Sequence, residues 1–385
     1  MKIIKSDIKQ RKLVAVITNH DDDIYCFRKE LIESIQKMGF DILISCPYGE
    51  KLELMPQIKF VHDNVKIDRR GTNPISDVRL LFHYSRVIKA YKPDVILAYT
   101  VKPNIYASLV ASRLGIPYIN NVTGFGSILK MNKWIYFLVM HLFKIAFKHS
   151  SCVFFQNKQN MDFAVKKKLL VGDYKLIPGS GVNIKRFPLQ NYPDGGNGIN
   201  GKPIIFNYIG RVLRDKGIDD YIEAAIRIKK KYPNTEFNII GFIEPTEKHY
   251  IEQLESLEEK NIVIYKGQQK DVRPFIARAH ATIHPSTYGE GMSNVLLESA
   301  ASGRVLITTD NPGCKETVDD NVNGYIYHGG NVDELVEKIE TFLLISNEER
   351  KSMGIKSRDK VKKIFNRDLV INAYLEKIQE LVNDD

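Results

Sequence analysis

The sequence predicts an α/β protein built from two doubly wound, Rossmann-like domains. Short apolar runs alternate with segments of helical periodicity along most of the 385 residues, and this alternation is typical of parallel strands joined by crossover helices. It occurs on both sides of residues 191–203, which have the glycine-, asparagine- and proline-rich composition of a linker. The length also favours two domains over one.

The first half, residues 1–190, contains short apolar runs with polar boundaries, as expected of strands buried in a parallel sheet. Helical spacing follows several of these runs, and glycines at 39 and 115 end two of the helices as C-terminal glycines do. We predict strands at 13–18, 41–46, 95–99, 118–122, 152–156 and 175–177, and helices at 27–37, 78–89 and 105–113.

The second half repeats the scheme over residues 204–365, and a final helix at 366–385 is expected to pack back on the first domain. Two such domains joined by a linker would face each other across a cleft, where doubly wound sheets usually bind ligands. We predict strands at 204–209, 237–240, 262–265, 281–283 and 305–308, and helices at 221–231 and 294–301.

The composition is that of an ordinary globular protein, which excludes disordered and collagen-like classes. Its positive charge is concentrated in one half: the net charge is +10, with 30 basic and 15 acidic residues up to position 190 and an excess of five acids after it. Such a half favours an anionic partner, either a phosphorylated substrate or an anionic membrane surface, or is simply a solvated basic face. The sequence lacks nucleic-acid-binding motifs, so a nucleic-acid partner is not expected.

Four widely spaced cysteines form neither a disulfide framework nor a zinc motif, which suits a reducing cytosol. Residues 1–12 are polar and basic, unlike a signal peptide. The longest apolar run, at 134–147, is too short to span a bilayer. Lysines flank it, so it is either a helix lying in the interface of an anionic leaflet or a buried crossover helix, and both interpretations stay open.

The densest motif is HPSTYGEGMSNVLLE, at residues 284–298. A strand leads into a glycine-bracketed loop and then into a helix that starts near Ser293, and free N–H groups at such a helix start bind anions such as phosphate. Glu290 and Glu298 would repel phosphate, so we interpret them as acceptors for sugar hydroxyls.

A second motif, NYIGRVLRDKG, covers residues 207–217. The strand ends at Gly210, and Arg211 and Lys216 precede a helix that begins near Asp219. A guanidinium fork and an ammonium point charge together suit a diphosphate.

These two motifs, with TTDNPGCKETVDDNVNGY in the second half and YTVKPNIYASLVASRLGIPYINNVTGFGS and IPGSGVNIKRF in the first, resemble the retaining nucleotide-sugar glycosyltransferases of family 4, which have the two-domain GT-B fold. Within the family, the chain is most similar to bacterial transferases that extend lipid-linked oligosaccharides, several of which are α-1,3-N-acetylgalactosaminyltransferases. The pair of glutamates at positions 290 and 298 is the specific part of this resemblance.

The resemblance implies that residues 204–365 bind the nucleotide sugar. Glu290 would contact the donor sugar and Glu298 the ribose, while Arg211 and Lys216 would hold the diphosphate and stabilise the departing UDP. Gly210 would lie at the same site, and three backbone N–H groups at the helix start would assist, those of Gly291, Met292 and Ser293.

The resemblance also implies that residues 1–190 bind the acceptor. Many relatives carry a histidine before a glycine in this domain, and the matching residues here are Thr123 and Gly124. The first strand–helix loop, residues 19–25, lacks the glycines common in the family, and Arg28 and Lys102 are candidates for the acceptor's phosphates.

We expect no metal ion and no cofactor, since the UDP-sugar is a substrate. Residues 21–23 contain an Asp-x-Asp, but they follow the first strand, where a helix N-terminus attracts carboxylates anyway. Cys314 is interpreted as a packed thiol.

The prediction is therefore a retaining glycosyltransferase that moves a sugar, N-acetylgalactosamine by resemblance, from a UDP-sugar to an undecaprenyl-diphosphate-linked saccharide in O-antigen, capsule or glycoprotein glycan synthesis. It would be peripheral on the cytoplasmic face of the inner membrane and bind no nucleic acid. A transferase for another UDP-hexose, a nucleotide-sugar epimerase of similar fold and a non-catalytic nucleotide-sugar-binding scaffold are the alternatives.

Overall fold

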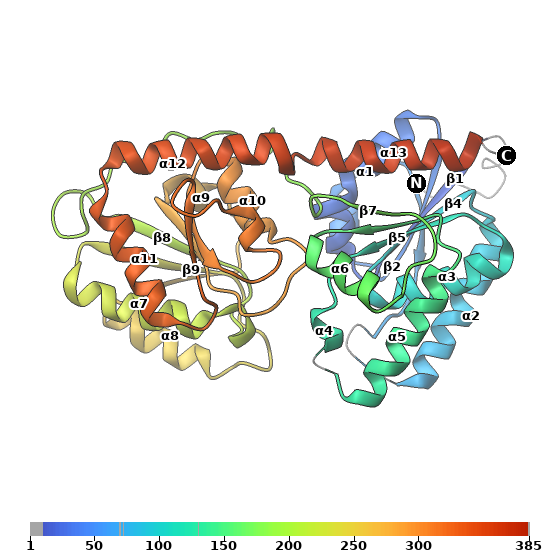
Figure 1. Ribbon diagram of the computed structural model, residues 1–385, viewed down its shortest axis with the longest axis horizontal. Coiled ribbons are helices and arrows are strands. Elements are labelled where there is room, and N and C mark those ends of the chain that lie inside the picture. The colour runs from blue at the N-terminus through green and yellow to red at the C-terminus, as the bar shows by residue number, and fades with distance from the viewer. Residues whose placement is uncertain (1–10, 69–70, 72, 130, 384–385) are drawn as a thin grey trace. The chain divides into compact units, whose positions relative to one another are not determined.

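The structure is a computed structural model that describes residues 11–68, 71, 73–129 and 131–383. It consists of two compact units (Figure 1). Unit 2 is Gly181–Arg367, and unit 1 contains the residues before it and those from Asp368 onward. Each unit holds one parallel sheet with helices on both faces, so the predicted fold class is confirmed.

The sheet of unit 1 has seven strands in the order β3-β2-β1-β4-β5-β6-β7, all parallel. Strand order reverses between β1 and β4, and ligands of doubly wound sheets bind at the carboxyl ends of the strands at such a reversal. The strands are β1 (Leu13–Ile17), β2 (Asp41–Cys46), β3 (Val61–Asn64), β4 (Val95–Tyr99), β5 (Tyr118–Val122), β6 (Cys152–Phe155) and β7 (Tyr174–Leu176).

Helices cover both faces of this sheet (Figure 1). Alternate residues of β1 point to opposite faces, so Val14 packs with α1 and with Tyr374 of α13, whereas Ala15 packs with Tyr84 of α2. One face carries α1 (Lys29–Lys37), which follows a π-helix at Asp23–Arg28, and α13 (Arg367–Asn383). The other carries α2 (Pro74–Tyr91), α3 (Val101–Leu114) and α5 (Lys133–Phe147), and the short α4 (Gly126–Leu129) and α6 (Lys158–Lys166) complete the unit.

The sheet of unit 2 has six parallel strands in the order β10-β9-β8-β11-β12-β13, so its reversal lies between β8 and β11. The strands are β8 (Ile204–Ile209), β9 (Thr235–Ile240), β10 (Ile264–Gly267), β11 (Ala281–His284), β12 (Val305–Thr309) and β13 (Gly324–Tyr327). The helices are α7 (Ile218–Lys231), α8 (Tyr250–Glu259), α9 (Arg273–Arg278), α10 (Asn294–Ala301), α11 (Val332–Leu344) and α12 (Asn347–Lys360). Helices α7, α8 and α11 share one hydrophobic core, and α9 and α10 share another.

The structure places residues 191–203, the predicted linker, on unit 2, and the chain passes between the units at Ser180–Gly181 and Arg367–Asp368. Side chains of unit 2 hold this segment: the Tyr192 hydroxyl donates to the His280 carbonyl at 2.7 Å, and Arg350 donates to the Gly196 carbonyl at 2.8 Å. Its glycines and asparagines therefore form tight loops on the surface of unit 2. The final helix has its residues from Asp368 onward in unit 1.

Within the described part of the chain, no helix combines the length and the apolar character needed to cross a membrane.

Candidate nucleotide-sugar site

The candidate site of unit 2 lies where strand order reverses. Residues 210–217 follow β8, residues 285–293 follow β11, and both loops lie at the carboxyl ends of these neighbouring parallel strands. The fold thus brings together the two motifs that the sequence singled out, which are far apart in the chain.

Gly217 fixes the distance between the two loops. Its φ is +72°, and a Cβ atom at this position would lie 2.0 Å from the carbonyl oxygen of Pro285. Only glycine tolerates both the left-handed backbone and this approach. The N–H of Thr287 donates to the carbonyl of Asp215 at 3.2 Å, which joins the loops on the other side of Lys216.

Lys216, Glu290 and His284 form a connected cluster. The Nζ of Lys216 lies 2.6 Å from Oε1 of Glu290, and Nε2 of His284 lies 3.1 Å from the same oxygen. All three side chains are largely buried, with exposed fractions of 16% for Lys216, 14% for Glu290 and 5% for His284. The Thr308 hydroxyl donates to the His284 carbonyl at 2.8 Å and anchors the end of β11.

This cluster keeps the Glu290 carboxylate charged. Burial would raise its pKa, but the Lys216 ammonium and the His284 hydrogen bond lower the pKa well below its ordinary value of 4.5. An ionised carboxylate is a strong acceptor for sugar hydroxyls, and a partly buried ammonium is a strong donor to phosphate oxygen. The pair therefore offers both functions that a sugar diphosphate requires.

Cys314 lies beside this cluster, and ligand atoms of Cys314, His284 and Glu290 lie within 4.8 Å of one another. Burial raises the pKa of the Cys314 thiol well above its ordinary value, and the charge of Glu290 raises it further. The Glu290 carboxylate of this group is engaged by the Lys216 ammonium.

Arg211 leaves the end of β8 and pairs with a carboxylate of the neighbouring loop. Its Nη1 lies 2.5 Å from Oε1 of Glu244, and the guanidinium side chain is 39% exposed. The Arg211 carbonyl accepts the hydroxyl of Tyr208 at 2.7 Å. Gly241 allows the backbone at Gly210 to come close, because a Cβ on Gly241 would lie 1.8 Å from the Gly210 carbonyl oxygen.

The predicted helix start is present, since Ser293 is the N-cap of α10. However, the Ser293 N–H donates to the Gly313 carbonyl at 2.7 Å, so in this structure it does not point to a phosphate site. Met292 and Gly291 are buried, Met292 in the core beneath α10. The loop after β12 thus covers part of the helix start that we expected to meet phosphate.

Glu298 lies on α10, where the charges of Arg186, Arg367 and Asp271 act on its carboxyl group. Burial raises the pKa of Glu298 to about 7, although the two arginines lower it. This carboxyl therefore titrates near neutral pH.

The acceptor-side candidates lie in unit 1. Arg28 is buried, with its guanidinium 4.2 Å from the centre of the Tyr99 ring and its Nη1 3.3 Å from the Ser180 hydroxyl. Its Nε has no hydrogen-bond partner among the described residues. Lys102 instead forms an ion pair of 2.7 Å with Asp77.

Thr123 and Gly124 directly follow β5, and Gly124 has a φ of +133° that disfavours any side chain.

Two residues of the site carry no role in the sequence interpretation, His284 and Glu244. His284 is the first residue of the HPS motif and ends its strand, so its position in the sequence could have identified it as a site residue. Glu244 lies 33 positions after Arg211, on the loop after β9, and no motif marks it.

Comparisons with known proteins identify the family of the chain. Residues 14–157 match the family model described as "Glycosyl transferase 4-like", and residues 194–360 match "Glycosyl transferases group 1". A Campylobacter jejuni relative, N,N'-diacetylbacillosaminyl-diphospho-undecaprenol α-1,3-N-acetylgalactosaminyltransferase, is 24% identical over 96% of this chain and 99% of its own. The Staphylococcus aureus capsular polysaccharide glycosyltransferase CapM is 24% identical over 88% of this chain and 90% of its own.

Solved structures show the same fold. A Rickettsia africae glycosyltransferase superposes with a TM-score of 0.79 at 16% identity, covering 98% of this chain and 100% of its own. Anabaena HepE in complex with UDP and glucose superposes with a TM-score of 0.77 at 15% identity, covering 96% of this chain and 100% of its own. The chain belongs to the GT-B glycosyltransferases, with a glycosyltransferase 4-like first domain and a group 1 second domain.

Proposed function

We propose that this glycosyltransferase is a retaining enzyme that moves N-acetylgalactosamine from UDP-N-acetylgalactosamine to a saccharide linked to undecaprenyl diphosphate. The product would enter O-antigen, capsule or glycoprotein glycan synthesis. The observation that carries the proposal is the Lys216–Glu290 pair at the reversal of strand order, 2.6 Å apart and largely shielded from water.

In this proposal, donor binding exchanges the partners of that pair. Lys216 turns to the diphosphate and Glu290 to hydroxyls of the donor sugar, while His284 keeps its hydrogen bond to the carboxylate. Arg211 adds a second cation on the same loop. Negative charge grows on the diphosphate as the bond to the sugar breaks, so cations held here stabilise the transition state more than the ground state.

The acceptor hydroxyl attacks the anomeric carbon on the face that UDP leaves, and its proton passes to an oxygen of the departing phosphate. No protein base is then required, and the configuration at the anomeric carbon is kept. Lys216 and Arg211 supply the positive charge, so we expect transfer to continue in the presence of EDTA. Glu298 would accept hydrogen bonds from the ribose hydroxyls.

The acceptor would bind unit 1. Arg28 is the candidate best suited to a diphosphate. It is a buried cation that forms no ion pair within the described residues, whereas Lys102 is paired with Asp77. The names of the relatives support such an acceptor: the Campylobacter jejuni protein is named for a diphospho-undecaprenol substrate. All four cysteines are free thiols, which suits the cytoplasmic face of the inner membrane.

The test is transfer from a panel of UDP-sugars to lipid-linked mono- and disaccharides, with the linkage of the product assigned by NMR. We expect transfer from UDP-N-acetylgalactosamine with an α-linkage, and UDP release that depends on the acceptor. An inverted linkage would overturn the retaining mechanism. A donor isomerised without any acceptor would indicate an epimerase, and binding without turnover would indicate a scaffold.

A further inference from the structure

Helix α5 has two apolar faces, and only one of them packs in the core. Met140, Phe143 and Phe147 are buried against α3, β5 and β6. On the opposite face, Trp134 is 88% exposed, Phe137 66% and Leu138 58%. For residues 134–147, the sequence allowed either a buried crossover helix or a helix lying in a membrane interface. Helix α5 has the features of both.

Helix α2 repeats this arrangement. Leu80, Tyr84 and Ile88 pack on the sheet, whereas the outer face exposes Ile75, Val78 and Phe82 by half or more of their surface. We call the six exposed residues the outer apolar face: Ile75, Val78 and Phe82 of α2 with Trp134, Phe137 and Leu138 of α5.

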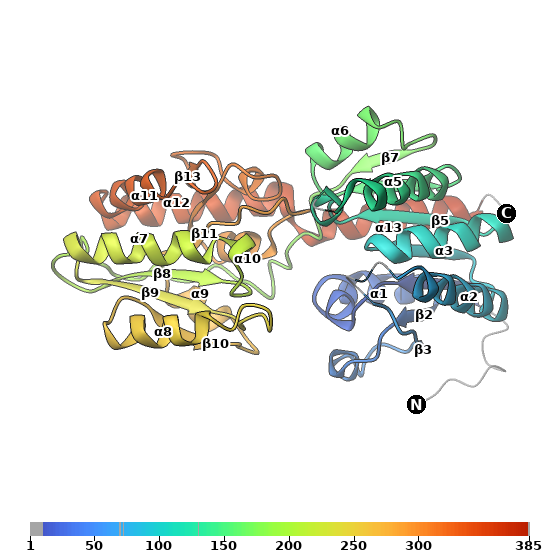
Figure 2. The same ribbon diagram turned by 90° about the horizontal axis from the view of Figure 1, so that it is seen from below.

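The two halves of the outer apolar face lie at the same end of one helical layer. Helix α3 packs between α2 and α5, as Figure 2 shows. Crossover helices run opposite to the parallel strands they connect, so the first turns of α2 and α5 both lie at the carboxyl ends of the strands. Neighbouring helix axes are about 8–10 Å apart, so these halves are separated by roughly 20 Å or less. A flat partner can contact both.

The charges around this face have one dominant sign. Helix α5 carries no acidic residue, and its lysines at 133 and 144 and the C-cap Lys148 are exposed. The acid in the first turn of α2, Asp77, is neutralised by Lys102.

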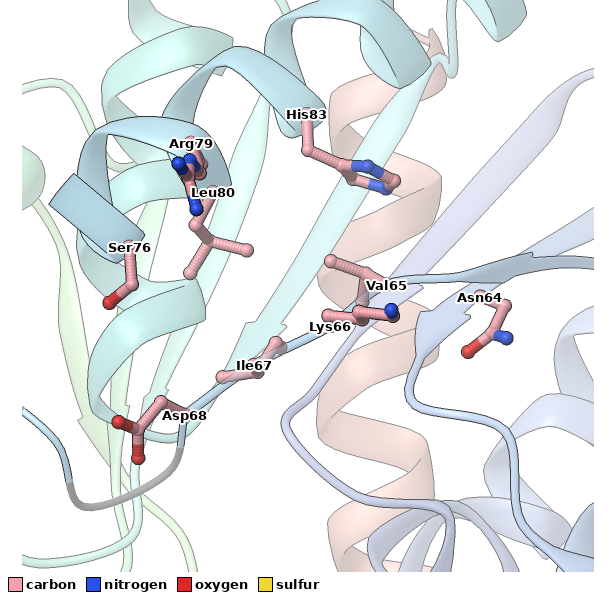
Figure 3. Close-up of a pocket in the computed structure, with 9 residues that line it drawn as sticks. All are labelled: Asn64, Val65, Lys66, Ile67, Asp68, Ser76, Arg79, Leu80 and His83. Carbon is pink, nitrogen blue, oxygen red and sulfur yellow. The ribbon is translucent and has the colours of Figure 1, made fainter.

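Beside α2, a pocket of about 640 Å³ opens between that helix and the loop after β3 (Figure 3). Lys66 and Arg79 line it, and within the described residues neither forms an ion pair. His83, also at the pocket, is paired with Asp63 at 2.9 Å. Asp68 also lines the pocket, so two cations and one carboxylate adjoin the apolar residues of α2.

We propose that unit 1 docks on an anionic phospholipid bilayer through the outer apolar face. The six apolar side chains enter the interface, while Lys66, Arg79 and Lys133 meet lipid phosphates, the combination that binds interfacial helices to anionic leaflets. A second copy of the chain is a poorer occupant, because it would bring two basic faces together. This inference goes beyond the proposed transferase activity and does not depend on it.

The chain contains a single tryptophan, and it is Trp134. Its fluorescence therefore reports on this face in the unmodified protein. With vesicles of phosphatidylcholine and phosphatidylglycerol, we expect a blue shift of emission, several-fold weaker quenching by acrylamide, and new quenching by brominated lipid. With phosphatidylcholine alone, or with anionic vesicles in high salt, the shift should largely disappear.

Phe82→Glu tests whether α2 belongs to the same contact, because the probe itself stays unchanged on α5. We expect about a tenfold or greater loss of apparent vesicle affinity, since a charge replaces an inserted ring. Leu344→Glu is the matched control: Leu344 is 76% exposed on α11 of unit 2, and its variant should bind vesicles like the unmodified protein. Both positions are exposed, so each variant should fold, and circular dichroism is the check.

Three fluorescence results would overturn the proposal. The emission of Trp134 could stay constant with anionic vesicles, shift equally with zwitterionic vesicles, or shift with protein concentration alone, which would indicate self-association. An equal loss of affinity in Leu344→Glu would also contradict it. No donor, acceptor or turnover enters this assay, so its failure leaves the proposed transferase function standing, and the reverse also holds.

Discussion

The ammonium of Lys216 contacts the carboxylate of Glu290 at 2.6 Å across two loops that are 74 positions apart in the chain. Each group is held by the other where water has little access. A ligand that replaces this contact must supply an anion for Lys216 and hydroxyl donors for Glu290 together, and a sugar diphosphate carries both.

Lys216→Ala and Glu290→Ala should each remove most transferase activity. Breaking one partner of a shielded charge pair costs about 2–5 kcal/mol, which corresponds to a loss in rate of tens to thousands. The measurement is UDP release in the presence of acceptor. Lys230→Ala is the control, because Lys230 is exposed on α7 and its loss should change little. Near-normal transfer by either site variant would contradict the assignment.

The charge state of Glu290 makes a prediction about acid stability. Its folded pKa lies well below its ordinary value of 4.5, because Lys216 and His284 outweigh the effect of burial. The ionised state thus contributes stability above pH 4.5, and this contribution is lost as pH falls below that value. Urea unfolding should show Glu290→Gln destabilised at neutral pH, with the difference from the unmodified protein shrinking in acid. A difference that is constant with pH would exclude this origin.

The contribution of Glu298 to folding stability should change with pH in the opposite direction. Burial raises its pKa to about 7, so the folded state binds this proton more tightly than the unfolded chain. Its stabilising effect is complete below pH 4.5 and is lost as pH rises through 7. The total change is up to about 3 kcal/mol, since one pKa unit corresponds to about 1.4 kcal/mol. Relative to the unmodified protein, Glu298→Gln should gain stability from pH 5 to pH 8.

The same titration tests the role of Glu298 in donor binding. If its carboxylate accepts ribose hydroxyls, UDP affinity measured by calorimetry should rise with pH near 7 and stay flat in Glu298→Gln. Glu348→Gln, at an exposed position of α12, should keep the normal profile. A pH profile that is unchanged in Glu298→Gln would remove this residue from the site.

Gly217→Ala should disrupt the site by moving the two loops apart. The new Cβ would meet the Pro285 carbonyl at 2.0 Å, on a backbone with φ of +72°, and the left-handed conformation alone costs about 1–2 kcal/mol for an L-residue. We expect a lower unfolding free energy and a loss of activity comparable to Lys216→Ala. Gly289→Ala is the control in the same site, since its Cβ would have no atom within 4 Å. Equal stability of the two variants would show that the contact between loops is not required.

The strands could be predicted because a buried parallel strand is a continuous apolar run. Two were missed, β3 with the sequence VHDN and β13 with GYIY, and both lie at the edges of their sheets. Strand β3 is only partly buried and mostly polar, whereas β13 is largely buried but is four residues long and begins with a glycine. The segment at 191–203 has the composition of a linker because turns and linkers use the same residues. Only tertiary contacts, such as that of Tyr192 with His280, distinguish the two.

The site could be predicted in part. The residues of its two motifs were found because each follows a strand directly, and the fold brings such positions together. Two ion-pair partners of candidate residues were not found: Glu244 pairs with Arg211 from another loop, and Asp77 pairs with the acceptor-side candidate Lys102 from another helix. Ion pairs between distant segments depend on packing, and no periodicity in the sequence encodes them.

Helix α13 completes the core of unit 1, where Val370, Tyr374 and Ile378 pack with residues of β1, β4 and β6. A ribosome synthesises most of unit 1 first, yet these residues leave the exit tunnel only after the whole of unit 2. Unit 2 is continuous in the chain, so it can acquire its full core while translation is still under way. The first-made unit is therefore the last to be finished, and nascent chains that stop before α13 should present an unfilled apolar surface to chaperones.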